Sequence, residues 1–319
     1  MKIFIENLRP NMSPYNGKGK FVQRLAAAIT GLGHQVVDRP EQCNINFRMN
    51  ALPSTTHGKR VVRLDSIAYT NDVMHRKIEN NKALRSAIKA ADGIVYQSQV
   101  ARQLCEGVLD IVHRNTAVIG NGIQRKGFSP TTIELPGRKN FVFACQFLHH
   151  MRRTNRLLEA WEQFVAYKDD AWLHIVYGEN MTETRLEGHK NVQLHSILKQ
   201  PELNNLTHSC DAALLLTYQD ACPNYAAEAL ACNTPIITNN TNGICEYINT
   251  SCGWVLNIDG GHTFERAQWS DPPFVNGHEL VQALERVYQQ PRQQVDFPQA
   301  LEIETVAGHY LEFFKSLTA

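Results

Sequence analysis

Two carboxylates, Asp220 and Glu228, stand eight residues apart in the stretch "YQDACPNYAAEALACNTPIITNN". Asp220 lies in a Cys/Pro/Asn loop, and Glu228 opens an Ala/Leu segment that predicts a helix. A Pro-Ile-Ile run then predicts a strand. One carboxylate therefore lies on a loop and the other just inside a helix, at the carboxyl edge of a parallel sheet. Ligands of doubly wound sheets bind at this edge.

The elements around this pair alternate between strand and helix along the whole chain. Residues 2–8, 34–37, 45–49, 59–65 and 93–98 read as strands of a first series, with helices at 21–33, 73–92 and 99–109. Residues 128–140 lose periodicity and gain Pro and Gly. A second series begins at residue 141. This alternation predicts an α/β fold with two Rossmann-like, doubly wound domains that face a central cleft.

Charge is divided unevenly between the two halves. Residues 1–140 carry 21 Lys/Arg against 10 Asp/Glu, a net charge of +11, whereas residues 141–319 carry 11 against 21, a net charge of −10. Such asymmetry indicates a polyanionic partner for the basic half. The alternative is that the two halves attract each other across the cleft.

The remaining composition is that of an ordinary globular protein. The N-terminal "MKIFIENL" is too short and too soon polar for a signal peptide, and no apolar run approaches a membrane span. The eight cysteines form no CxxC pair, which argues against zinc and indicates reduced, buried thiols. We expect a cytoplasmic protein. The sequence does not indicate an oligomeric state.

The order of these motifs resembles the retaining GT-B glycosyltransferases of family 4 (group 1). The likeness rests on "RLLEAW" after a basic cluster, on "HIVYG", and on the run from "VQLHS" to "EALACNTPIIT", with Asp220 and Glu228 at the family's E-x7-E element. It is strong over about residues 141–250. The segment "RLDSIAYTND" with "IKAADGIVYQS" is similar to members carried by phages and large viruses.

The resemblance implies domains at residues 1–139 and 140–300, and a helix at 301–319 that packs back on the first domain. It implies transfer of a sugar from a UDP- or GDP-linked donor with retention and without an obligatory metal. Asp220 would lie at the transferred sugar, Glu228 would bind the ribose hydroxyls, and Arg152 and Arg153 would clamp the diphosphate. The other expected donor-binding residues are Gly17, Gly19, Gln146, Gly178, His195, Leu198 and Asn224.

Two positions depart from the family pattern. The first acid of the E-x7-E element is the shorter Asp220, and the strand at 141–147 lacks the usual Gly-Arg. Gln146 stands where that phosphate-binding Arg belongs, or Arg153 compensates for it. A catalytically silent binding module therefore stays open as an alternative. A Rossmann dehydrogenase is disfavoured, because "NGKGKFV" lacks the third glycine of G-x-G-x-x-G.

The acceptor is expected on the basic first domain. Phosphate neutralisation by its cations would drive DNA binding, so the preferred acceptor is a hydroxymethylated pyrimidine in DNA, flipped into the cleft. Asp65, at the end of a strand, would orient the acceptor hydroxyl or act as a base. A glycolipid or lipopolysaccharide acceptor at a membrane surface is the competing prediction. The expected acceptor-binding residues are Lys18, Lys20, Arg63, Arg85, Lys89, Arg125 and Lys126.

Overall fold

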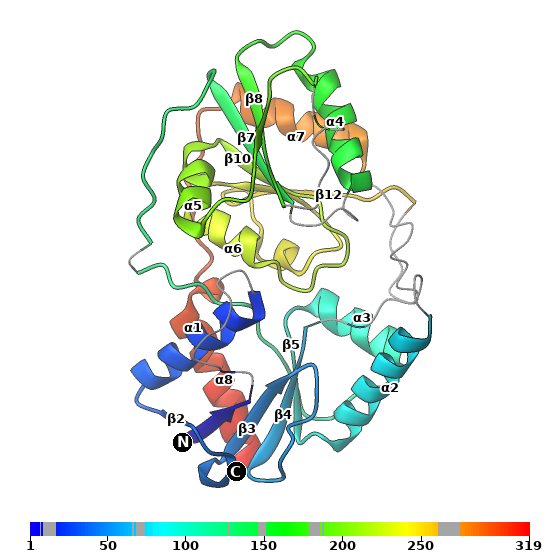
Figure 1. Cartoon of the computed structure of the whole chain (residues 1–319), viewed down its shortest axis with the longest axis vertical. Coiled ribbons are helices and arrows are strands. Elements are labelled where there is room, and N and C mark those ends of the chain that lie inside the picture. Colours follow the sequence, from blue (N-terminus) through cyan, green and yellow to red (C-terminus); the bar gives the residue numbers. More distant parts are fainter. Residues whose placement is uncertain are drawn as a thin grey trace.

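The computed structural model shows two α/β domains, one above the other, with the chain passing between them (Figure 1). The structure describes residues 1–319 except 7, 9–16, 66, 68–73, 127, 146–150, 179–185, 187 and 261–274, and the side chains of residues 17–18, 74–79, 145 and 151–153 are likewise left undescribed. Each domain contains one six-stranded parallel sheet. This confirms the predicted pair of Rossmann-like domains.

The first sheet has the strand order β2-β1-β3-β4-β5-β6. Its nearly uninterrupted apolar strands are covered on both faces, as a parallel sheet requires. The elements are β1 (Lys2–Ile5), α1 (Gly17–Gly31), β2 (Gln35–Val37), η1 (Pro40–Gln42), β3 (Ile45–Met49), β4 (Lys59–Leu64), α2 (Met74–Ala90), β5 (Gly93–Tyr96), α3 (Gln99–Leu109) and β6 (Thr116–Val118).

The second sheet has the strand order β12-β11-β10-β7-β8-β9. Phe141, Trp161 and Phe164 form the centre of one of its two apolar cores. The elements are β7 (Lys139–Cys145), α4 (Met151–Val165), β8 (Ala171–Tyr177), β9 (Val192–His195), α5 (Gln200–Ser209), β10 (Ala212–Leu215), α6 (Asn224–Ala231), β11 (Ile236–Asn239), η4 (Gly243–Tyr247), β12 (Gly253–Leu256), α7 (Gly277–Gln289), η5 (Gln299–Leu301) and α8 (Ile303–Thr318).

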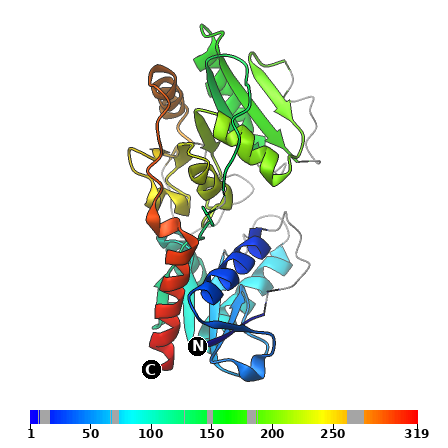
Figure 2. The ribbon, with the colours of Figure 1, turned by 90° about the vertical axis from the view of Figure 1, so that its left-hand side faces the viewer.

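Helix α8 returns to the first domain and lies along it (Figure 2). Tyr310 and Phe314 are fully buried, and their rings pack on Phe47 at centroid distances of 5.6 and 6.1 Å. The chain thus crosses between the domains twice. The two crossing segments pair with each other, because Ile123 N donates to Leu301 O (2.8 Å) and Ile303 N donates to Ile123 O (3.1 Å).

The expected glycine loop is shorter than the sequence indicated. Gly17 and Gly19 belong to the first turn of α1 instead of preceding it. The first turn tolerates glycine because its N–H groups have no intrahelical partners to lose. The N-terminal end of α1 nevertheless lies at the carboxyl edge of the sheet, toward the second domain (Figure 1).

Candidate functional site

The two acids both follow β10 at its carboxyl end, on the side of the second sheet that faces the first domain (Figure 1). Helix α6 begins at Asn224, so Glu228 lies in its second turn and not at its start. The helix dipole acts mainly on the first turn, and it therefore gives little reason for an acid at this position. Glu228 is only 8% exposed, which calls for specific partners.

Glu228 is connected to the first domain through a side-chain relay. Gln200, at the start of α5, donates from Nε2 to Glu228 Oε2 (3.1 Å). Gln200 Oε1 in turn accepts a hydrogen bond from Lys20 Nζ on α1 (2.5 Å). Glu228 Oε1 accepts no hydrogen bond from any described residue, so this oxygen is available to a ligand hydroxyl.

Arg24 lies one turn after Lys20 on the same face of α1 and adds a second cation. Its NH2 group donates to Asn224 Oδ1 at the start of α6 (3.2 Å). Burial lowers the pKa of Arg24, and the nearby Glu228 carboxylate opposes that change. Its Nε is buried and has no hydrogen-bond partner within the described part of the chain. Two cations from the first domain thus converge on the Glu228 helix.

The loop that carries Asp220 is fixed through its main chain. Asn242 Oδ1 accepts from Asp220 N (3.1 Å), and Asp220 O accepts from Gly243 N (2.9 Å). A Cβ at Gly243 would stand 1.9 Å from Ala221 O, so only glycine permits the two loops to approach this closely. The loops after β10 and β11 are therefore locked together. Asp220 itself is partly exposed.

A buried polar cluster closes the first-domain side of the cleft. Asp65 accepts from Gln97 Nε2 (2.6 Å) and from Asn50 Nδ2 (3.3 Å), and its Oδ1 lies 2.8 Å from Arg63 Nε. Asn121 accepts from Arg63 NH2 (2.6 Å). Asp65 directly follows β4 at the carboxyl edge of the first sheet, where it is buried and already has several donors. Its assignment as a base stays a prediction.

The structure corrects the predicted role of Arg63. The sequence suggested a surface cation for an acceptor, but Arg63 is 2% exposed and its guanidinium lies 3.7 Å from the centre of the Phe21 ring. Burial would lower the pKa of Arg63, and Asp65 raises it, with a net rise. Arg63 balances Asp65 inside the domain, so it offers no contact to DNA.

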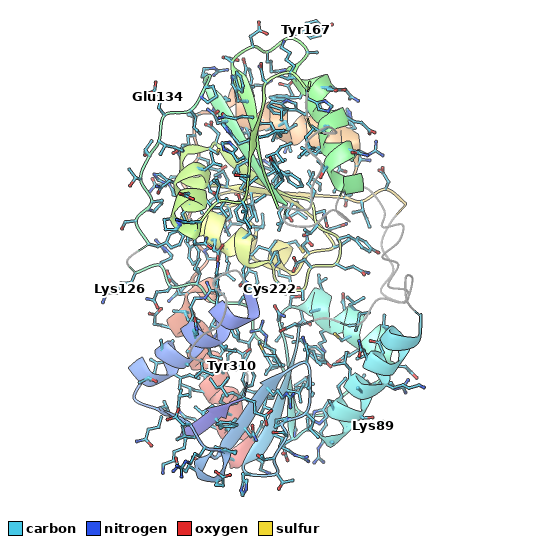
Figure 3. The ribbon with its side chains drawn as sticks, in the orientation of Figure 1. Lys89, Lys126, Glu134, Tyr167, Cys222 and Tyr310 are labelled. Atoms are coloured by element: carbon cyan, nitrogen blue, oxygen red, sulfur yellow. The ribbon has the colours of Figure 1, made fainter. Side chains whose placement is uncertain are left out.

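Asn121 and Cys222 join the two domains at this level. Asn121 Nδ2 donates to Cys222 O (2.8 Å), and Asn121 N donates to Cys222 Sγ (3.3 Å). Burial raises the pKa of the Cys222 thiol to about 12, so it is protonated at neutral pH. Cys222 lies at the junction of the domains (Figure 3). The link keeps the Asp220–Glu228 segment against the first domain.

Most of the other predicted acceptor-binding cations lie away from the cleft. Lys89 is in the last turn of α2, at the opposite edge of the sheet (Figure 3). Arg85 is one turn closer to the cleft. Arg125 pairs with Glu302 (3.0 Å) beside the crossing segments, and the neighbouring Lys126 is exposed at the outer edge of the molecule. Lys20 points to the donor side, toward Gln200.

The predicted nucleobase side follows β8 and β9. Gly178 is buried directly after β8, and Leu198 packs against the α5–α6 core. His195 ends β9, and its Nε2 lies 3.0 Å from His174 Nδ1. Burial lowers the pKa of both rings, that of His174 to about 4. Both imidazoles are therefore neutral at pH 7 and can share one N–H.

Several of the predicted site residues lie outside the described part of the structure. Gln146 is one of them, and the side chains of Lys18, Arg152 and Arg153 are others. Their expected roles stay predictions. Conversely, sequence reasoning missed Arg24, Gln200 and Asn121. Arg24 had a detectable signal, because it follows Lys20 by four residues on a helix that opens at the cleft.

Comparison with known proteins adds a family signal to this geometry. Residues 128–257 match the family model described as glycosyl transferases group 1. This segment contains both acids and most of the second sheet. The match supports a group 1 glycosyltransferase domain in this chain. A search of curated protein sequences finds no match.

Solved glycosyltransferase structures share the complete two-domain arrangement. Sucrose-phosphate synthase of Thermosynechococcus elongatus is 13% identical with a TM-score of 0.68, over 99% of this chain and 98% of that one. HepE of Anabaena, solved with UDP and glucose, is 13% identical with a TM-score of 0.66 (99% and 100%). WaaG, from lipopolysaccharide biosynthesis, is 14% identical with a TM-score of 0.62 (100% and 98%). The fold is GT-B.

Among the described residues, no three or more His, Cys, Asp or Glu side chains are grouped as a metal site would need. No described helix combines the length and the apolar character that crossing a bilayer demands.

Proposed function

We propose that this protein is a retaining glycosyltransferase that moves a sugar from a UDP- or GDP-linked donor to an acceptor hydroxyl. The observation that carries the proposal is the position of Glu228. It is a nearly buried carboxylate with one oxygen available, it lies between the domains, and it is linked to two cations of α1. The family match over residues 128–257 supports a nucleotide-sugar donor.

The proposed chemistry assigns a role to each part of this site. Glu228 binds the ribose hydroxyls, since a carboxylate accepts two hydrogen bonds. Departure of the diphosphate leaves negative charge, which cations and main-chain N–H groups stabilise. Lys20 is connected to Glu228 through Gln200, and Arg24 interacts with the charge of Glu228. Arg152 and Arg153 are expected to join them. Asp220 lies on the fixed loop beside the sugar position.

For the acceptor we propose a hydroxymethylated pyrimidine in DNA, as in phage-type DNA modification. The net charge of +11 on residues 1–140 supports a polyanion. The structural likeness to WaaG, which is named for lipopolysaccharide biosynthesis, favours the lipopolysaccharide acceptor as the second candidate. A basic surface would serve either partner.

The test is nucleotide release from a panel of UDP- and GDP-sugars. Each donor is incubated alone, with duplex DNA carrying 5-hydroxymethylcytosine, with unmodified duplex, and with lipopolysaccharide. Release that requires the hydroxymethylated duplex supports both donor and acceptor, and NMR of the linked sugar then shows whether configuration is retained. Release that requires lipopolysaccharide rejects the DNA acceptor. No release with any donor rejects the enzyme in favour of a binding module.

Glu228→Gln provides the matched variant for this assay. It keeps the size of the side chain but removes the charge, so we expect weaker nucleotide binding and a loss of activity of about 100-fold or more. Glu202→Gln on the neighbouring helix α5 is the control, because its carboxylate only caps that helix. Equal activity of the two variants would remove Glu228 from the site.

A further inference from the structure

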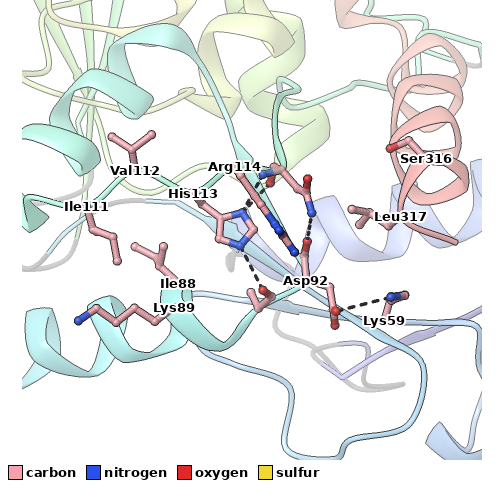
Figure 4. A pocket seen from close by; sticks show the side chains of 12 residues that line it. Lys59, Ile88, Lys89, Asp92, Ile111, Val112, His113, Arg114, Ser316 and Leu317 are labelled. Atoms are coloured by element: carbon pink, nitrogen blue, oxygen red, sulfur yellow. Dashed lines mark hydrogen bonds and ion pairs between the residues drawn. The ribbon is translucent and has the colours of Figure 1, made fainter. Parts of the chain in front are cut away.

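A second cavity lies at the opposite edge of the first sheet from the cleft. It measures about 550 Å³, and residues of α2, of the segment before β6 and of the end of α8 line it (Figure 4). A neighbouring hollow of about 570 Å³ shares Lys59 and Asp92 with it. β4 separates Lys59 from Asp65 by six residues, or roughly 20 Å. A small molecule bound here cannot also contact Glu228.

The side chains around these two hollows carry an excess of positive charge. Lys59, Arg60, Lys89 and Arg114 line them, against the single carboxylate of Asp92. The side chains of Lys89 and Arg114 are exposed and make no hydrogen bond or ion pair with any described residue. Asp92 lies 3.8 Å from Lys59 Nζ and is thereby partly balanced.

The negative ends of two helices account for part of this positive charge. α2 and α8 both end at this edge, and each C-terminus carries about −0.5 charge. Arg60 neutralises part of this negative charge, because it donates a hydrogen bond to Ala90 O (2.7 Å) at the end of α2. Four cations less the carboxylates of Asp92 and Ala319 and the two helix ends still leave about +1. The excess exceeds what the helix ends require.

The cations also continue along α2 toward the cleft. Lys82, Arg85 and Lys89 lie on one face of this helix, since they are three and four residues apart. They cover about 10 Å, which corresponds to about three nucleotides of one DNA strand. A linear polyanion that follows this face runs along the second half of α2 to the cavity.

We propose that the cavity and this face of α2 form a second binding site for the phosphate backbone of a nucleic acid. Phosphates would contact Lys89, Arg114 and Lys59, and deoxyribose carbons would rest on the apolar floor that Ile88, Ile111 and Leu317 provide. Val112 is the single strongly exposed large apolar residue among those that line the cavity, which is too little to anchor a membrane.

The site is independent of the chemistry in the cleft, so its test uses binding alone. Anisotropy of an unmodified, labelled 20-base-pair duplex is measured without donor over a range of salt concentrations. Lys89→Glu/Arg114→Glu should weaken binding at least about tenfold at low salt and reduce the slope of log K against log salt by about two. Arg39→Glu/Arg286→Glu removes the same charge from exposed positions on other faces and should bind nearly as wild type.

Two outcomes of this experiment would contradict the proposed site. Equal loss in both double variants would overturn the site and leave only a nonspecific effect of net charge. Binding to vesicles containing phosphatidylglycerol without binding to duplex would overturn it in favour of a lipid surface. Circular dichroism verifies that each variant is folded. If Lys89→Glu/Arg114→Glu does not fold, the charge-neutralising variant Lys89→Gln/Arg114→Gln takes its place. UDP binding, followed by thermal shift, should be unchanged in all variants and reports separately on the cleft.

Discussion

At the scale of single residues, Arg24 adds a cation to the proposed donor site that the sequence analysis did not identify. The second domain lacks the Gly-Arg that the family resemblance leads one to expect after its first strand, and Gln146 stands there instead. Arg24 places a guanidinium from the opposite domain beside Asn224 and Glu228. An arginine fork binds phosphate oxygens in a bidentate way. If this protein binds a diphosphate, we expect Arg24 to supply from the first domain the cation that the second domain lacks.

If Arg24 stabilises the leaving diphosphate, Arg24→Ala should lower kcat by about 100-fold or more, the usual cost of losing one such group. Arg24→Lys should recover only part of this, because an ammonium lacks the fork. Steady-state nucleotide release with the best donor measures both. Gln23→Ala, an exposed neighbour on α1, is the control. A change in KM with unaltered kcat would instead make Arg24 a ground-state binding residue.

The His174–His195 pair should make stability depend on pH. Burial holds the pKa of His174 at about 4, below its unfolded value of 6.5. The folded state therefore binds fewer protons between these values, so the pair's contribution is complete above pH 6.5 and falls as the pH drops toward 4. At acidic pH the loss in the free energy of unfolding approaches about 3 kcal/mol.

Urea unfolding at pH 7.5, 6 and 5 tests this expectation. Wild type should exceed His174→Gln in stability at pH 7.5, and the difference should shrink with acidification. His309→Gln changes an exposed histidine of α8 and should show a constant difference from wild type. A constant difference for His174→Gln as well would contradict the assigned cause.

At the scale of elements, a short helix of the second domain, η4, caps the N-terminus of helix α3 in the first domain. Glu246 of η4 accepts from Gln99 N (3.0 Å) and Val100 N (2.9 Å), the first two N–H groups of α3. Ser98 supplies the local cap by accepting from Ala101 N (2.9 Å). A carboxylate at a helix N-terminus is favoured by both the free N–H groups and the dipole.

Glu246→Gln should therefore weaken the contact between the domains. We expect a loss of about 1 kcal/mol and faster amide exchange at the start of α3, with the rest of that helix unchanged. Hydrogen exchange by mass spectrometry measures this. Glu106→Gln, farther along α3, removes an acid of the same helix without touching the other domain. Similar exchange in both variants would argue against the cap.

Element order was predictable from the sequence, because periodicity of 2 and 3.6 distinguishes strands from helices. The positions of Asp220 and Glu228 followed from it, since both come after a strand. The sequence predicted Lys89 as an acceptor-binding cation but not its distance from the cleft, and the structure places it in the last turn of α2. Helices of a parallel sheet run back to the start of the next strand, so the last turn of α2 must lie at the far edge. The burial of Arg63 depends on Asp65 and Asn121, which only tertiary pairing brings together.

At the scale of the whole molecule, the end of the chain completes the domain that the beginning starts. Phe314 and Tyr310 of α8 lie within the same core as Phe21 and Phe47. The return segment also pairs with the outgoing one at Ile123, and Gly122 packs so closely there that a Cβ would stand 2.7 Å from Ile303 Cα. The first domain is thus formed from two separate pieces of sequence, and the second domain from the continuous piece between them.

Phe314→Ala should consequently destabilise the first domain, although residue 314 lies near the end of the chain. Removal of a buried Phe costs about 3–5 kcal/mol. Hydrogen exchange should increase in β1, β3 and β4, with β7 and β8 unchanged, because the cavity opens in the first core alone. Phe164→Ala is the matched variant in the second domain, where Phe164 packs on Phe141 and Trp161. It should give the reverse pattern. If both variants loosen all strands equally, the two domains unfold as one cooperative unit, and the contacts at Asn121 and Glu246 are strong enough to couple them.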